Sequence, residues 1–185
     1  MWNKGLSYRE RHGLIETVMN TKLNDDVNST IDKAKYHHSL GLVFFPAFDW
    51  KISETHPERQ ERLLYTRDQI VEEGLLDIPN IREYNPIVAD WDTIERVHVG
   101  APNLESWVTE AHRVSAGGAI AAADAVICGE VDRAFALVRP PGHHAMAMVH
   151  GIRGFCTINI EAVMIQHIRQ TYGIKRVAVV DTDVH

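Results

Sequence analysis

The chain has 185 residues, of which 45% are apolar and 24% charged, a composition typical of a globular domain and not of a disordered chain. Its formal net charge of -6 argues against a nucleic-acid-binding surface, because binding phosphates by charge requires a concentrated basic stripe. The longest apolar run, at residues 40–48, is far shorter than the roughly 20 residues of a membrane-spanning helix, and the N-terminal stretch lacks the apolar region of a secretory signal. We therefore expect neither nucleic acid nor membrane as a partner, and the oligomeric state stays open.

The first half of the chain predicts a polar N-terminal extension of unknown role (residues 1–38), followed by the start of an α/β domain (residues 39–185). Apolar runs and turn residues predict a strand over residues 41–45 and a short strand over residues 81–84. A helix is expected over residues 57–73, ended by Gly74.

The second half predicts an alanine-rich helix over residues 103–128, in which Gly117 and Gly118 are expected to let another element approach closely. A strand over residues 133–138, a helix over residues 159–172 and a strand over residues 176–181 follow. Cys128 and Cys156 lie in apolar stretches and are too few for a disulfide framework, which favours a reducing, cytoplasmic setting.

The last strand, helix and strand have the pattern of a right-handed crossover between parallel strands. Ligands of a parallel sheet bind beyond the carboxyl ends of its strands. The segments "RPPGHHA" and "DTDVH", which follow the two strands, are therefore expected at one edge of the sheet.

In "DTDVH", an extended backbone would place Asp181, Asp183 and His185 on one face, since side chains alternate along a strand. Two carboxylates and an imidazole in one small volume favour a divalent cation, either zinc, iron(II) or manganese. A solvated strand end with capping aspartates is the alternative.

In "RPPGHHA", a rigid turn presents His143 and His144, which suit general acid and base catalysis beside a metal. Two surface histidines are the alternative. In "GFCTIN", Gly154 permits close backbone approach, and Phe155 is either an apolar wall of a site or a core residue.

The ordered motifs "HPERQERL", "AGGAIAAADAV", "AFALVRPPGHHA", "GFCTIN" and "VAVVDTDVH" resemble the histone deacetylase superfamily of zinc-dependent amidohydrolases, over roughly residues 40–185. The resemblance implies a three-layer α/β/α, arginase-like fold with a mostly parallel sheet. It also implies hydrolysis of an acetyl or other acyl amide on lysine or a polyamine.

Carried onto this sequence, the resemblance makes Asp183 and His185 zinc ligands, with a monovalent-cation (K⁺) site in the backbone around them. His144 matches the general base, and Asp181 matches the carboxylate partner of His143. The resemblance further implies that Gly154 and Phe155 line an acyl-lysine tunnel, with Cys156 beside it and Arg62 beneath the active site.

The family's third ligand, an aspartate, its transition-state tyrosine and the aspartate partner of His144 follow "DTDVH" in family members. The sequence is therefore expected to be the N-terminal portion of a longer enzyme, inactive alone. The connection "ERVHVGAPNLESW" is also shorter than the family's substrate-binding rim loop. An arginase-type manganese hydrolase and a non-catalytic truncated product are the alternatives.

Overall fold

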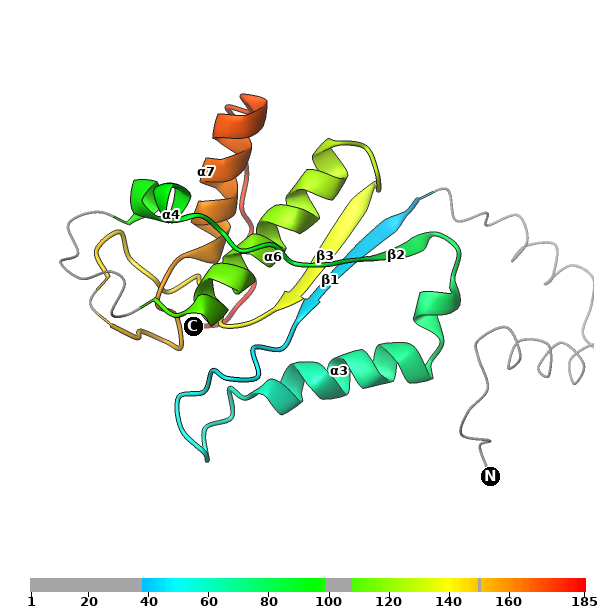
Figure 1. Ribbon diagram of the computed structural model, residues 1–185, viewed down its shortest axis with the longest axis horizontal. Helices are drawn as coiled ribbons and strands as arrows, with labels where there is room; N and C mark the ends of the chain where they lie inside the picture. Colours follow the sequence, from blue (N-terminus) through cyan, green and yellow to red (C-terminus); the bar gives the residue numbers. More distant parts are fainter. Residues whose placement is uncertain (1–37, 99–107, 150) are drawn as a thin grey trace, which may run out of the picture.

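The computed structural model describes residues 38–98, 108–149 and 151–185, and these residues build a parallel sheet with helices around it (Figure 1). The strands are β1 (Leu40–Phe45), β2 (Ile81–Tyr84) and β3 (Arg133–Val138), in the order β2-β1-β3. Both ladders are parallel. The three corresponding predicted strands and the α/β class with a parallel sheet are confirmed.

The helices lie on both sides of the strands in Figure 1, with α3 on one side and α6 on the other. Their bounds are α3 (Gln60–Glu72), η1 (Leu75–Asp77), α4 (Trp91–Val97), α6 (Glu110–Ile127) and α7 (Ile160–Tyr172). The short helix α4 was not predicted from the sequence, although Asp90 caps it by accepting a hydrogen bond from the Thr93 N–H. The predicted helices over residues 57–73 and 159–172 are confirmed, the first beginning three residues later than expected.

Two predicted segments fall wholly or partly outside the described residues. They are the N-terminal extension, of which residues 1–37 are not described, and the first part of the helix expected over residues 103–128. The described part of that helix begins at Glu110, after Thr109 in an extended conformation. None of the described helices combines the length and apolarity needed to cross a membrane.

Helix α6 packs closely on the sheet through its paired glycines, as predicted. A Cβ atom on Gly117 would lie 1.9 Å from the Ile87 carbonyl oxygen, and one on Gly118 would lie 2.6 Å from Val138 Cγ1. Glycine is therefore required where this helix meets β3 and the segment before α4. The main buried cluster gathers on this side of the sheet and comprises Ala89, Ile94, Val108, Ala116, Ile120, Val149, Ile158, Ile160 and Val163.

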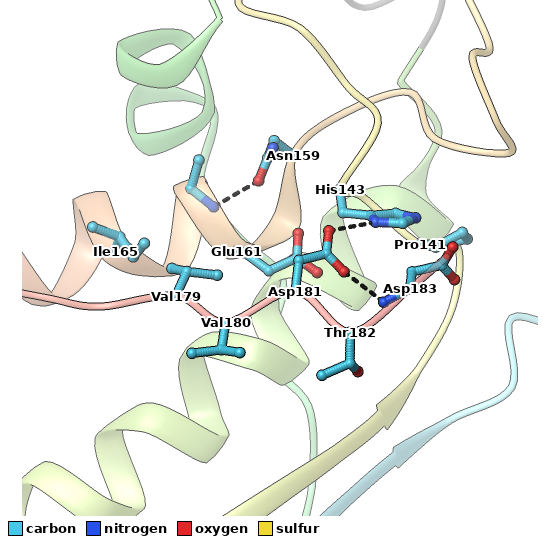
Figure 2. A pocket seen from close by; sticks show the side chains of 11 residues that line it. Pro141, His143, Asn159, Glu161, Ile165, Val179, Val180, Asp181, Thr182 and Asp183 are labelled. Carbon is cyan, nitrogen blue, oxygen red and sulfur yellow. Dashed lines mark hydrogen bonds and ion pairs between the residues drawn. The ribbon is translucent and has the colours of Figure 1, made fainter. Parts of the chain in front are cut away.

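The strand predicted over residues 176–181 is wrong. These residues are described and lie in no β-ladder, and the Val179 and Val180 side chains are 57% and 84% exposed. Alternating valines favour an extended backbone, but a strand also needs a hydrogen-bonded neighbour. Val179 and Val180 line a cavity together with Ile165 of α7 (Figure 2). Because residues 176–181 pair with no strand, the predicted strand-helix-strand crossover does not form among the described residues.

His112, in the first turn of α6, is a buried neutral histidine. Its Nδ1 accepts a hydrogen bond from the Thr109 N–H at 3.1 Å, and its ring meets Trp50 edge-on. Its Nε2 is buried without a hydrogen-bond partner in the described part of the chain. Burial lowers the pKa of His112 to about 4.

Acid is therefore expected to destabilise the protein through His112. Between about pH 6.5 and the folded pKa of about 4, the unfolded histidine binds a proton that the folded one does not, so stability falls as pH falls. The loss is on the order of 3 kcal/mol. In His112→Gln, a non-titrating amide oxygen replaces the acceptor, so urea unfolding followed from about pH 7 to pH 4 should show a smaller loss of stability than wild type. Equal losses in the two proteins would contradict this assignment.

Candidate functional site

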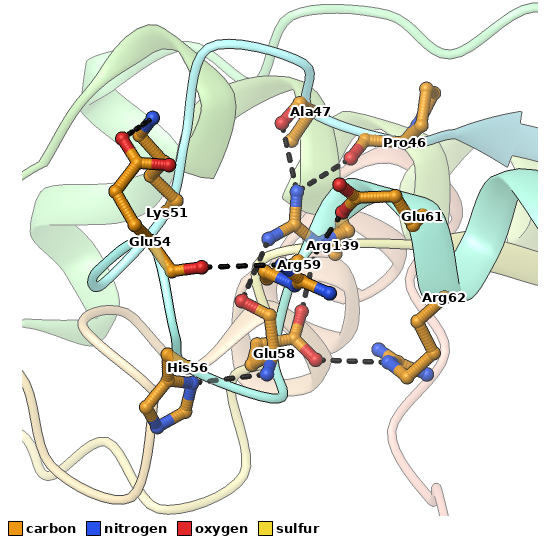
Figure 3. A network of polar contacts seen from close by, with 10 residues as sticks. All are labelled: Pro46, Ala47, Lys51, Glu54, His56, Glu58, Arg59, Glu61, Arg62 and Arg139. Carbon is orange, nitrogen blue, oxygen red and sulfur yellow. Dashed lines mark hydrogen bonds and ion pairs between the residues drawn. The ribbon is translucent and has the colours of Figure 1, made fainter.

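The loop that carries the tandem histidines leaves β3 at Arg139, a fully buried arginine (Figure 3). Arg139 Nη1 donates to the carbonyl oxygens of Pro46 and Ala47 at 2.7 and 2.8 Å, and Arg139 Nε donates to Glu58 Oε1 at 2.8 Å. A buried guanidinium is tolerated when its donors are satisfied and its charge is paired, and both conditions hold here. The base of the loop is thus fixed to the end of β1 and to the segment before α3.

Arg62 joins the same network from α3. Its Nε donates to Glu58 Oε2 at 2.9 Å, so one carboxylate bridges two arginines, while the Arg62 side chain is 53% exposed. Sequence reasoning singled out Arg62 but missed Glu58, whose burial depends on its contact with Arg139, the residue that follows β3. The proposed place of Arg62 beneath an active site stays a prediction.

His143 is paired with Asp181, as the family resemblance implied. His143 Nδ1 lies 2.8 Å from Asp181 Oδ2, and Figure 2 shows the two side chains facing each other. This hydrogen bond raises the pKa of His143 and lowers that of Asp181. The Asp181 carboxylate therefore favours the charged form of the His143 imidazole. The two residues meet even though residues 176–181 form no strand beside β3.

His144 packs against the backbone of Gly154. A Cβ on Gly154 would lie 2.4 Å from His144 Cδ2, and Gly154 has a φ of +51°. Phe155 follows with a φ of +71°, in a tight turn closed by reciprocal backbone hydrogen bonds between Arg153 and Cys156. The sequence expectation that Gly154 permits close backbone approach is confirmed, and the group that approaches is the catalytic candidate His144.

Phe155 and Cys156 differ in exposure. The Phe155 ring is 42% exposed and meets His56 edge-on at 4.5 Å between centroids, so it is not a core residue. Cys156 is fully buried, and burial raises the pKa of its thiol to about 11, which keeps it protonated and unreactive. Their places in an acyl-lysine tunnel stay predictions. Cys128, in contrast, is exposed, and both thiols are free.

Three of the predicted site residues converge on one point. One ligand atom from each of His143, His144 and Asp183 lies within 4.8 Å of the others. His185 does not join this group: its side chain is 83% exposed, and its Nδ1 lies 3.8 Å from Asp183 Oδ1. The arrangement differs from the expected face of three alternating side chains, because Asp181 and Asp183 each accept a hydrogen bond from the backbone N–H two residues later.

A cavity of about 670 Å³ adjoins this group, between the start of α7 and residues 179–183. Glu161 lines it and was not singled out from the sequence; its Oε2 is buried without a hydrogen-bond partner among the described residues, and burial raises its pKa. In the sequence, Glu161 is recognisable only as an acidic residue in the first turn of a predicted helix. Such a residue usually does no more than interact favourably with the helix dipole.

The chain is similar to known proteins in both sequence and fold. A family model described as histone deacetylase domain matches residues 101–185. A probable deacetylase of Archaeoglobus fulgidus is 35% identical over 164 residues, covering 78% of this chain and 45% of the relative. A histone deacetylase-like amidohydrolase of Pseudomonas aeruginosa is 50% identical over 76 residues, or 41% of this chain and 20% of the relative. The mouse polyamine deacetylase HDAC10 is 31% identical over 159 residues, which cover 74% of this chain and 24% of the relative.

The chain thus spans less than half the length of these relatives. The crystal structure of the HDA15 HD domain superposes with a TM-score of 0.57 at 24% identity, over 74% of this chain and 44% of that one, which shows a shared fold. The family model over residues 101–185 and the named deacetylases among the relatives support placing this chain in the histone deacetylase superfamily.

Proposed function

We propose that the chain carries part of the catalytic centre of a zinc-dependent amidohydrolase that removes acetyl or other acyl groups from lysine or polyamine amines. The observation that carries this proposal is the convergence of His143, His144 and Asp183 beside the hydrogen-bonded pair of His143 and Asp181. Relatives named as deacetylases and as an amidohydrolase support amide hydrolysis as the reaction class.

Zinc fits the donors present, because zinc sites in proteins use imidazole nitrogen and carboxylate oxygen. We assign Asp183 and His185 to the metal; their 3.8 Å separation is compatible with one shared ion. Iron(II) accepts the same donors, and the backbone from Asp181 to His185 is the candidate site for a structural K⁺. A bound zinc ion polarises an acyl carbonyl and acidifies a water molecule.

The two histidines are assigned to proton transfer. Asp181 Oδ2 accepts a hydrogen bond from the Nδ1–H of His143 and favours the charged imidazolium, whose Nε2–H can then donate its proton to the departing amine. His144, packed on Gly154, is assigned as the base that takes a proton from water. We assign to the exposed ring of Phe155 the contact with the aliphatic part of an acylated amine.

This proposal is tested by joining residues 1–185 to the region of the Archaeoglobus relative that lies beyond the match, since the chain spans 45% of that relative. We expect the fusion to hydrolyse acetyl-lysine peptides or acetylpolyamines, a chelator to stop the reaction and zinc to restore it. A folded, zinc-loaded fusion that hydrolyses neither substrate would contradict the proposal.

The metal assignment predicts that Asp183→Asn weakens zinc affinity in this fusion by about 100-fold or more, beyond the 10- to 100-fold loss typical of residues that merely orient a ligand. Asp68→Asn, which removes an equal charge from an exposed position of α3, should leave zinc affinity unchanged. Zinc titration against a competing chelator measures both variants. Equal affinities in Asp183→Asn and wild type would remove Asp183 from the ligand set.

A further inference from the structure

His98 is a buried histidine whose ring joins two parts of the candidate site. It ends α4, is 3% exposed, and lies far along the chain from both groups that it contacts. Its Nε2 lies 2.9 Å from the backbone nitrogen of Asn159, and its Nδ1 lies 2.9 Å from the carbonyl oxygen of Met146. The ring therefore connects the loop that follows the tandem histidines to the start of α7.

These two contacts fix the protonation state of His98. The Asn159 N–H can only donate, so Nε2 must carry a lone pair, and Nδ1 then carries the single proton and donates to Met146. A protonated imidazole would present N–H groups at both positions and would lose the Asn159 contact. The bridge thus exists only with a neutral ring.

Asn159 extends the connection on the other side. Its Oδ1 accepts from the Ala162 N–H at 2.9 Å, which caps α7 (Figure 2), and its Nδ2 donates to the Ala145 carbonyl oxygen at 3.4 Å. Ala145 directly follows His144. A displacement of His98 would therefore reach the histidine-bearing loop through both Met146 and Asn159.

From this geometry we infer that His98 is a positioning residue, which holds the loop of His143 and His144 against the start of α7 and releases it in acid. Its place in catalysis rests on the proposed function, but its structural effect needs neither metal nor substrate. His98 would thus act on the candidate site through Met146 and Asn159, without a contact to the residues assigned to proton transfer or to the metal.

Charged side chains on the elements that contact His98 interact with other groups and do not stabilise its protonated form. On its own helix Asp92 and Arg96 pair with each other, on α7 Glu161 interacts with His143 and Asp181, and on the loop Arg153 bonds the Met146 sulfur. The pKa of His98 is lowered by burial, which outweighs the opposing effect of the Met146 and Ala147 carbonyl groups; none of these charged side chains contributes.

The test compares wild type, His98→Gln and His98→Leu in the 185-residue chain by amide hydrogen exchange at about pH 7.5 and about pH 5, corrected for intrinsic exchange. A glutamine side chain can accept from Asn159 and donate to Met146 at both pH values. In wild type, we expect the Asn159 amide to exchange about tenfold faster at about pH 5 than at about pH 7.5. In His98→Gln the same amide should stay protected at both pH values, and in His98→Leu it should exchange fast at both.

The amide of Val43 in the central strand serves as the control for global opening and should not follow this pattern. The nitrogen chemical shifts of His98 in wild type give a second measurement, with a neutral ring protonated on Nδ1 expected at pH 7.5. The inference is overturned if the Asn159 amide stays protected in His98→Leu, or if wild type and His98→Gln share one pH dependence. The metal titration of Asp183→Asn tests the proposed function separately.

Discussion

His144→Ala, made in the fusion with the remaining region of the Archaeoglobus relative, is expected to lower kcat for the proposed amide hydrolysis by about 100-fold or more while zinc stays bound. The physical reason is the loss of a proton-transfer group whose ring lies among the ligand atoms of His143 and Asp183 but is assigned no bond to the metal. Loss of a base lowers the rate of the chemical step without removing a ligand. Turnover of acetyl-lysine substrate and zinc content are therefore measured on the same protein samples.

The same measurements distinguish the two roles that the convergence of these side chains permits. If His144 is a metal ligand, the alanine variant loses zinc together with activity, in parallel with Asp183→Asn. If it is a base, only the rate falls. Near-normal turnover with full zinc content would exclude both roles, whereas the variant Asp68→Asn on the exposed face of α3 should behave as wild type.

Gly154→Ala is expected to reduce kcat about as severely as removal of His144, by displacing its ring. The added Cβ would lie 2.4 Å from His144 Cδ2, a separation that the two groups cannot hold. The positive φ of Gly154 adds a backbone cost of roughly 1–2 kcal/mol for a residue with a Cβ. Activity should therefore fall much further than the small change in stability explains.

Gly173→Ala provides the matched control, since Gly173 has a φ of +68° and nothing within 4 Å of an added Cβ. It bears the same kind of backbone cost at the end of α7 without touching the site. We expect the two variants to lose similar stability in urea unfolding, and only Gly154→Ala to lose turnover. Equal kcat values in the two variants would contradict the prediction that a Cβ on residue 154 displaces the His144 ring and lowers kcat.

The sequence predicted the elements whose signals are local. The strands β1, β2 and β3 carry short apolar runs bounded by turn residues, and α7 begins with the cap Asn159 and ends at Gly173, which has a positive φ. The close packing at Gly117 was predictable as well, because a glycine pair in a helix is costly unless another element needs the space.

What the sequence could not predict depends on partners distant along the chain. Residues 176–181 have the alternation of a strand, but strand formation requires a neighbour, and the described residues supply none. In the sequence, Glu58 lies at the start of the helix predicted over residues 57–73, and His98 lies in no predicted element. Each becomes part of the site only through a distant contact, Glu58 with Arg139 and His98 with Asn159. His185 was expected beside the other site residues because an ideal extended backbone was assumed.

The buried guanidinium of Arg139 acts as a rigid spacer between two strand ends. It holds the carbonyl groups that follow β1 on one side and Glu58 on the other, with Trp50 stacked 5.0 Å from its centre. A lysine has a flexible stem and one donor group, so it could not keep several acceptors at fixed separations. Because a planar group beneath the loops sets the spacing of the two strand ends, we expect the outer parts of these loops to tolerate changes in length and sequence without a shift of the base of the tandem-histidine loop.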